Sequence, residues 1–162
     1  MKKAITLLLL IAGCAVVSYE GIITEQQVAK IPAGASEVHV SSKKPPGELY
    51  NAVYIHLVNR NGFQPARKDQ QMGYFSTKAH HMGQGTYIRI QVSVEPTPQG
   101  SIAIFRAQFK PDAETEQLAE AMSGTNLKLE WKQSKWEASK RHKASFAYLV
   151  STADPLGATS YK

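Results

Sequence analysis

The clearest pattern along the chain is a strict alternation over residues 86–95, in which the even positions from Ile88 to Val94 are apolar. Alternation of this kind is typical of a β-strand with one buried face. A turn segment rich in proline follows at 96–100, and the alternation resumes over 101–109 with two phenylalanines in phase. The two segments therefore predict an antiparallel hairpin.

Two further segments also predict strands. Residues 36–42 place Val38 and Val40 on one side and polar residues on the other. Residues 73–79 predict a strand through Tyr74, Phe75 and Thr77. Residues 80–85, which contain two histidines and two glycines, predict a loop.

The first helix is predicted over Glu48–Asn61. Leu49, Val53 and Leu57 recur at helical spacing, and the prolines just before them suit a first turn, where no N–H is needed. Asn61-Gly62 provides a left-handed stop.

A short acidic helix is expected after Asp112, whose side chain can cap it. The helix would run through Leu118 and Met122 and end at Gly124. Residues 127–131 alternate leucine with charged residues, which predicts a brief strand there.

The last helix is predicted to start at Ser134. Ser134 and Glu137 match a capping box, a hydroxyl followed three residues later by a carboxylate. Asp154-Pro155 would end the helix, and residues 156–162 show no clear period. The apolar residues that this helix would bury are Phe146, Leu149, Val150 and Ala153.

These elements predict an α+β fold in the order β-α-β-β-β-α. The economical arrangement is a single antiparallel sheet of about four strands with helices packed on one face. Residues 36–162 would form this one domain. Residues 14–35 have no sustained period, and we interpret them as a tether that extends up to ~3.3 Å per residue.

The first 13 residues have the organisation of a secretory signal. A positive start, Met1-Lys2-Lys3, precedes an apolar run dominated by leucine. Even if it is extended to Val17, the run has 14 residues, which is short of the ~20 that a membrane-spanning helix needs.

The end of that run, Leu10-Ile11-Ala12-Gly13-Cys14, resembles the bacterial lipobox. The resemblance implies cleavage between Gly13 and Cys14 and a diacylglyceryl group on the Cys14 thiol. Because two acyl chains anchor stably where one holds only marginally, the protein would remain on the membrane. The alternative is an ordinary secreted protein that is cut nearby. Ala15 follows the cysteine in place of the aspartate that retains lipoproteins at the inner membrane, so the resemblance favours the periplasmic face of the outer membrane.

Composition adds little to this picture. With 162 residues, 43% of them hydrophobic, the chain has room for one domain with a real core. Its single cysteine excludes an intramolecular disulfide. The net charge is +6, and the signal holds two of the lysines, so the mature chain would carry +4.

One basic cluster is dense enough to be a possible interaction surface, with two tryptophans, Trp131 and Trp136, close before it. It could contact anionic lipid or an acidic partner, but the favoured interpretation is that the tryptophans pack in the core and the lysines solvate a helix. Nucleic acid is excluded as a partner for an exported protein. The cluster consists of Lys140, Arg141, His142 and Lys143.

No catalytic, metal or cofactor site is predicted. His80-His81 has no nearby carboxylate in the sequence, the nearest being Asp69 and Glu95, and adjacent strand residues point to opposite faces. There is no nucleophile elbow and no phosphate-binding glycine motif. We therefore expect a protein that is not an enzyme.

The predicted domain also resembles the TATA-binding-protein-like or helix-grip domains of bacterial envelope lipoproteins, such as those of BamC. The helix up to Asn61, the strand 87–94 and the final helix through Tyr148-Leu149-Val150 carry this resemblance, which the segment 112–134 interrupts.

Two hypotheses follow for function. The first is a non-catalytic envelope lipoprotein that binds another protein. The alternative is a periplasmic lipoprotein that binds a glycan, a lipid or a small molecule.

Overall fold

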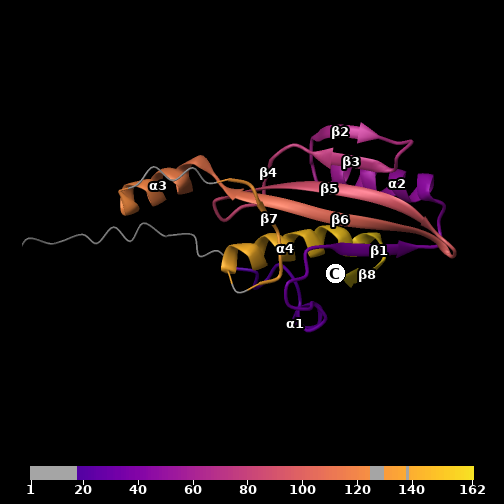
Figure 1. Cartoon of the computed structure of the whole chain (residues 1–162), viewed down its shortest axis with the longest axis horizontal. Helices are drawn as coiled ribbons and strands as arrows, with labels where there is room; N and C mark the ends of the chain where they lie inside the picture. The colour runs from indigo at the N-terminus through magenta and orange to yellow at the C-terminus, as the bar shows by residue number, and fades with distance from the viewer. Residues whose placement is uncertain (1–17, 125–129, 138) are drawn as a thin grey trace, which may run out of the picture.

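The computed structural model describes residues 18–124, 130–137 and 139–162. It is an α+β fold built on an antiparallel sheet (Figure 1). The strands are β1 (Val38–Ser42), β2 (Pro65–Asp69), β3 (Tyr74–Thr77), β4 (His80–His81), β5 (Thr86–Thr97), β6 (Gly100–Pro111), β7 (Lys132–Gln133) and β8 (Ala158–Tyr161). The helices are α1 (Glu25–Val28), α2 (Pro46–Ile55), α3 (Ala113–Ser123) and α4 (Lys140–Ala153), with a π-helical turn η1 (His56–Arg60) and a 3-10 turn η2 (Asp154–Leu156).

The sheet has eight strands, so the prediction of about four was wrong. Its main order is β2-β3-β5-β6-β1-β8, with β4 beside β5 and β7 beside β6. The predicted hairpin is confirmed, and its pairing runs without a break from Thr86 opposite Pro111 to Thr97 opposite Gly100. The unpredicted strands β2, β4, β7 and β8 have two to five residues each. β4 and β7 have only two residues each, and β2 is polar and mostly exposed, so these segments show no alternation of apolar and polar residues.

One face of the sheet, the inner face, holds the core. The even residues of β5 from Thr86 to Val94 and the odd residues of β6 are buried together with residues of α2 and α4. His56 Nε2 lies 2.8 Å from the carbonyl oxygen of Thr152, which joins the end of the first helix to α4. Helices α2 and α4 therefore cover the same face, as the sequence pattern predicts.

Two predicted helices have the expected ends. The first runs from Pro46 through the π-helical turn to Arg60, and Gly62 follows in the left-handed region at φ 70°. Helix α3 is capped by Asp112, whose side chain accepts from the Thr115 backbone N–H, and it ends at left-handed Gly124.

The predicted start of the last helix was wrong. The N-cap is Ser139, and Ser134 lies five residues before it with its side chain fully buried. Ser134 Oγ donates to Ser145 Oγ at 2.9 Å, which in turn donates to the carbonyl oxygen of His142. The hydroxyl of Ser134 therefore crosslinks the segment before α4 to the helix. The four predicted buried residues of α4 are confirmed.

Residues 18–35 are not an extended tether. Ile31 and Ala35 are buried in the core, and Tyr19 packs edge to face on Trp136 with ring centroids 5.0 Å apart. Trp136 also exchanges backbone hydrogen bonds with this segment, accepting from Gly34 N–H and donating to the carbonyl oxygen of Ala35. The apolar residues of this segment therefore serve the domain itself.

Two segments without a predicted structure form short strands. His80 and His81, expected in a loop, pair with Ile88 and Tyr87 of β5. The C-terminal tail pairs as β8 with β1. The predicted brief strand 127–131 lies mostly outside the described residues, as does Cys14.

Candidate functional site

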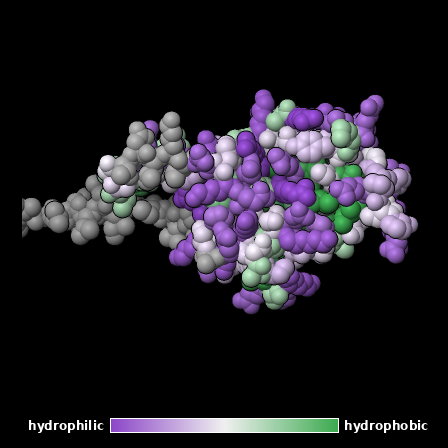
Figure 2. Space-filling view, viewed as in Figure 1, coloured by the Kyte–Doolittle hydropathy of each residue, from purple (hydrophilic) through white to green (hydrophobic). Residues whose placement is uncertain are grey.

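The outward-facing side chains of β5 and β6 form the first candidate surface. Since the even residues of β5 are buried from Thr86 to Val94, the odd residues between them point to the other face, and Gln91 is exposed there. Figure 2 shows hydrophilic residues gathered over β5 and β6, with a hydrophobic patch toward the turn of the hairpin. We call the following group the outer-face cluster: Tyr87, Arg89, Arg106, Lys110 and Trp131.

Trp131 is the centre of the outer-face cluster. The Arg89 guanidinium carbon lies 4.4 Å from its ring centroid and the Lys110 ammonium nitrogen 5.4 Å from it. The Nε of Arg89 also donates to the amide oxygen of Gln108 at 2.8 Å. Two cations thus stack on one half-buried indole, an arrangement that attracts each cation to the ring face.

Arg106 forms a charged group of three residues with Glu37 and His39, at the start of the strand β1 that pairs with β6. It contacts Glu37 through Nη2 at 2.6 Å, and Glu37 also holds His39 Nε2 at 2.7 Å. The hydrogen bond from His39, followed by that from Arg106, lowers the pKa of Glu37. Glu37 is therefore a carboxylate at neutral pH, and its charge is balanced within the fold.

The basic cluster predicted from the sequence does not form one surface. Lys140 is exposed, whereas Arg141 and His142 line a cleft of about 260 Å³. The Lys143 ammonium nitrogen lies over the rings of Tyr19 and Trp136, at 5.6 and 5.3 Å from their centroids. Helical spacing explains the separation, because consecutive residues of a helix point in different directions. Trp136 is 7% exposed and packs in the core, as predicted. The same prediction was wrong for Trp131, which is half-buried under Arg89 and Lys110 and lies outside the core.

The cleft beside Arg141 brings together residues from three parts of the chain. Phe109 and Pro111 end β6, Lys132 belongs to β7, and Arg141 is in the first turn of α4. The full lining is Phe109, Pro111, Glu130, Lys132, Ser139, Arg141 and His142. Only Arg141 and His142 among these residues were predicted from the sequence, because the packing of α4 against the end of β6 is what brings the seven together.

His81 has a carboxylate partner that its place in the sequence does not reveal. Its Nε2 lies 3.0 Å from Asp112 Oδ2, at the start of α3. Hydrogen bonds from His81 and from the Thr115 backbone lower the pKa of Asp112 to about 2. His80 instead stacks on Phe63, and burial followed by the charge of His81 lowers its pKa. In the described part of the chain, no group of three or more His, Cys, Asp or Glu residues could hold a metal ion.

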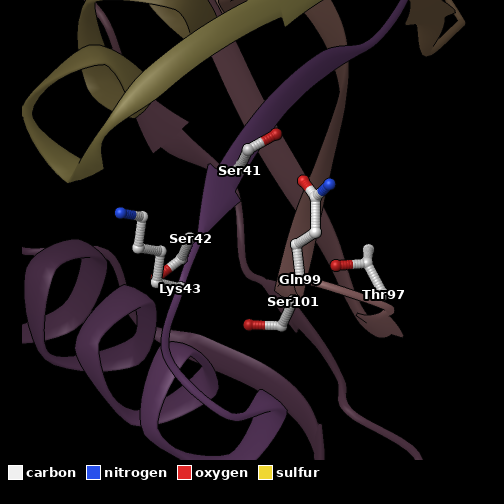
Figure 3. A pocket seen from close by; sticks show the side chains of 6 residues that line it. All are labelled: Ser41, Ser42, Lys43, Thr97, Gln99 and Ser101. Atoms are coloured by element: carbon white, nitrogen blue, oxygen red, sulfur yellow. The ribbon is translucent and has the colours of Figure 1, made fainter.

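A second cleft, of about 600 Å³, lies where β1 ends beside the β5–β6 turn (Figure 3). Gln99 points toward Ser41 in this view, and Lys43 points away from the other side chains. Ser101 Oγ donates to the carbonyl oxygen of Lys44 at 2.6 Å. Gly100 is required here, because a Cβ would collide with the Ser42 carbonyl oxygen. The hydrogen bond from Ser101 therefore holds the β5–β6 turn against the residues that precede α2.

The N-terminal predictions lie outside the described residues. These are the signal over residues 1–13, the cleavage site at Gly13 and the lipid-bearing Cys14. Within the described ranges, no helix is long and apolar enough to cross a membrane.

The sequence matches no protein-family model, and no curated protein matches it.

Proposed function

We propose that this protein is a non-catalytic, membrane-anchored envelope lipoprotein that binds another protein through the outer-face cluster. The lipobox ending at Cys14 supports the anchor, and the position of Ala15 supports the periplasmic face of the outer membrane. Attachment through an acylated cysteine would leave the folded domain free to meet a partner.

The observation that carries this proposal is the stacking of Arg89 and Lys110 on Trp131. Tryptophan, tyrosine and arginine are the residues most enriched at the energetic centres of protein interfaces. Here all three residue types occur together in the outer-face cluster, where Tyr87, Arg89 and Trp131 are each half-buried. The inner face, by contrast, uses its apolar residues to bind α2 and α4.

The charges of the outer-face cluster favour a partner with acidic residues. Arg106 is balanced by Glu37 within the fold, whereas the cations around Trp131 contact an aromatic ring in place of a carboxylate. A cation on an aromatic ring keeps its full charge, so it still attracts an anionic side chain. We infer that acidic side chains of the partner approach the Trp131 end of the face.

Crosslinking in intact cells tests this proposal. A photoreactive amino acid at Gln91, which is exposed on β5, should capture one reproducible envelope protein. The Trp131→Ala variant should lose most of that product, because truncation of a central interface aromatic commonly costs about 2 kcal/mol or more, or roughly thirtyfold in affinity.

The matched control places the same photoreactive group at Lys78, which is exposed but lies beyond the end of β3. It should capture no such product. An equal yield from Gln91 and Lys78, or a Gln91 product that Trp131→Ala leaves unchanged, would remove the outer-face cluster from consideration. A mature N-terminus without lipid on Cys14, measured by mass spectrometry, would overturn the anchor separately.

A further inference from the structure

We propose that the cleft at the first turn of α4 binds a small amino-acid-like ligand, with its carboxylate on Arg141 and its apolar side chain against Phe109 and Pro111. This site goes beyond the proposed protein interface, since none of its lining residues belongs to the outer-face cluster. It assigns a ligand to residues with a polar group that lacks a hydrogen-bond partner among the described residues.

Arg141 is the first such residue. Among the described residues its guanidinium makes no hydrogen bond and no salt bridge, although it is half-buried on the cleft wall. Burial lowers the pKa of Arg141, and the charge of Asp112 opposes that shift. An arginine fork presents parallel donors that match the two oxygens of a carboxylate. A half-buried arginine that no carboxylate of the described residues contacts directly is therefore suited to bind an anion from solution.

His142 is the second residue of the cleft with a polar atom that lacks a hydrogen-bond partner within the described ranges. Its Nε2 lies 3.1 Å from Glu137 Oε1, and its ring packs edge to face on Phe109 with centroids 4.8 Å apart. Its Nδ1 is buried with no hydrogen-bond partner in the described chain. A buried polar atom left unpaired is destabilising, so structures normally satisfy it. The guanidinium of Arg141 and the buried Nδ1 of His142, on consecutive residues of α4, thus both lack a hydrogen-bond partner among the described residues.

The remaining lining residues narrow the class of ligand. Glu130 brings a negative charge to the same cleft, opposite in sign to Arg141 and Lys132. A doubly charged phosphate would be repelled by this carboxylate, whereas the ammonium group of an amino acid would be attracted to it. The volume of about 260 Å³ is below the usual range for drug-sized ligands, which suits a molecule the size of one amino acid.

Titration calorimetry on the purified full-length protein tests this site with three probes. L-leucine carries both charges and an apolar side chain, N-acetyl-leucine lacks the ammonium group, and inorganic phosphate lacks both the ammonium and the side chain. We expect leucine to bind more tightly than N-acetyl-leucine, and phosphate to bind more weakly than either. The Arg141→Gln variant should weaken leucine binding about tenfold or more, as expected for loss of a charge-assisted hydrogen bond.

The control variant is Lys140→Gln, which removes the same charge one residue earlier but outside the cleft. It should change the affinity for leucine less than about twofold, because an exposed charge outside the site interacts weakly through water. Circular dichroism would verify that both variants fold. No heat from leucine or N-acetyl-leucine at millimolar concentrations, or equal losses in the two variants, would overturn the proposal. Phosphate binding tighter than leucine binding would overturn the assigned ligand class.

Discussion

Helices α3 and α4 are similar in sequence character but opposite in their packing. Both were predicted as helices, and both have apolar residues at helical spacing. Helix α4 has eight buried residues, whereas none of the residues of α3 is buried, and its Met122 is 79% exposed. The comparison shows that an amphipathic pattern specifies a helix without specifying a surface to cover it.

The place of each helix along the sheet explains the difference. Helix α4 crosses β6 and β1 on the inner face, while α3 continues from the end of β6 and extends away from the sheet (Figure 1). The contacts that attach α3 to the rest of the domain lie at its first turn. Asp112 N–H donates to the carbonyl oxygen of Gly85, and Gly85 must be glycine because a Cβ would collide with the Thr115 hydroxyl.

The largest effect is expected from truncating the buried face of α4. Phe146→Ala should lower the free energy of unfolding by about 3–5 kcal/mol, because the fully buried ring would leave a cavity in the core. Leu118→Ala on α3 is the control and should change it by less than about 0.5 kcal/mol. Urea denaturation measures both. A loss of several kcal/mol from Leu118→Ala would mean that α3 also packs on a surface.

A smaller loss is expected at the segment that leads into α4. Ser134→Ala removes the donor to Ser145 inside the fold and should cost about 1–3 kcal/mol. Ser139→Ala should cost less than about 0.5 kcal/mol, because the side chain of this N-cap is exposed and makes no capping hydrogen bond. The same denaturation experiment compares the two. Equal losses would favour capping over the buried hydrogen bond as the role of these serines.

The smallest effect should be local to α3. Asp112→Ala removes the cap and should cost that helix about 1 kcal/mol, which would speed amide exchange in α3 about fivefold while β5 and β6 stay protected. Exchange measured residue by residue provides the test. Equal acceleration in α3 and in the hairpin would show that the helix and the sheet unfold together.

The same site predicts a dependence on pH. The pKa of Asp112 is about 2 in the folded chain, below its usual value of 3.8, so its stabilising charge is present in full above that usual value and is lost as pH falls toward 2. Amide exchange in α3 should therefore accelerate over this window. Asp112→Asn keeps a capping side chain without the charge, so its exchange should lack this dependence on pH. An identical acceleration in Asp112→Asn would assign the effect to other carboxyl groups.

The sequence predicted the elements that are specified by residues close together in the chain. The β5–β6 hairpin, the helix that follows Pro46 and the capped helix after Asp112 were all visible as alternation, helical spacing or cap residues. The start of α4 was misassigned because Ser134 and Glu137 have the spacing of a capping box but lie in a segment bound by tertiary contacts. Sequence spacing does not distinguish a hydroxyl that caps a helix from one buried against it.

The candidate sites were predictable only in part. The alternation in β5 places Arg89 on the outward face, but its pairing with Trp131 required the chain to return beside β6. Likewise, Arg141 and His142 were named as part of a basic cluster, and only the fold separates them from Lys140 and Lys143. Long-range proximity has no local sequence signal, so such sites appear only after packing.

By itself, the amino-acid sequence determined which segments show strand alternation or helical spacing, and it contains the segment that resembles a lipobox, from which the anchor at Cys14 is predicted. Tertiary structure alone decided that residues 18–35 dock on the domain, that the tail pairs as an edge strand and that α4 is covered while α3 is not. The physical reason is that backbone periodicity is a property of neighbouring residues, whereas burial and pairing depend on surfaces contributed by distant parts of the chain.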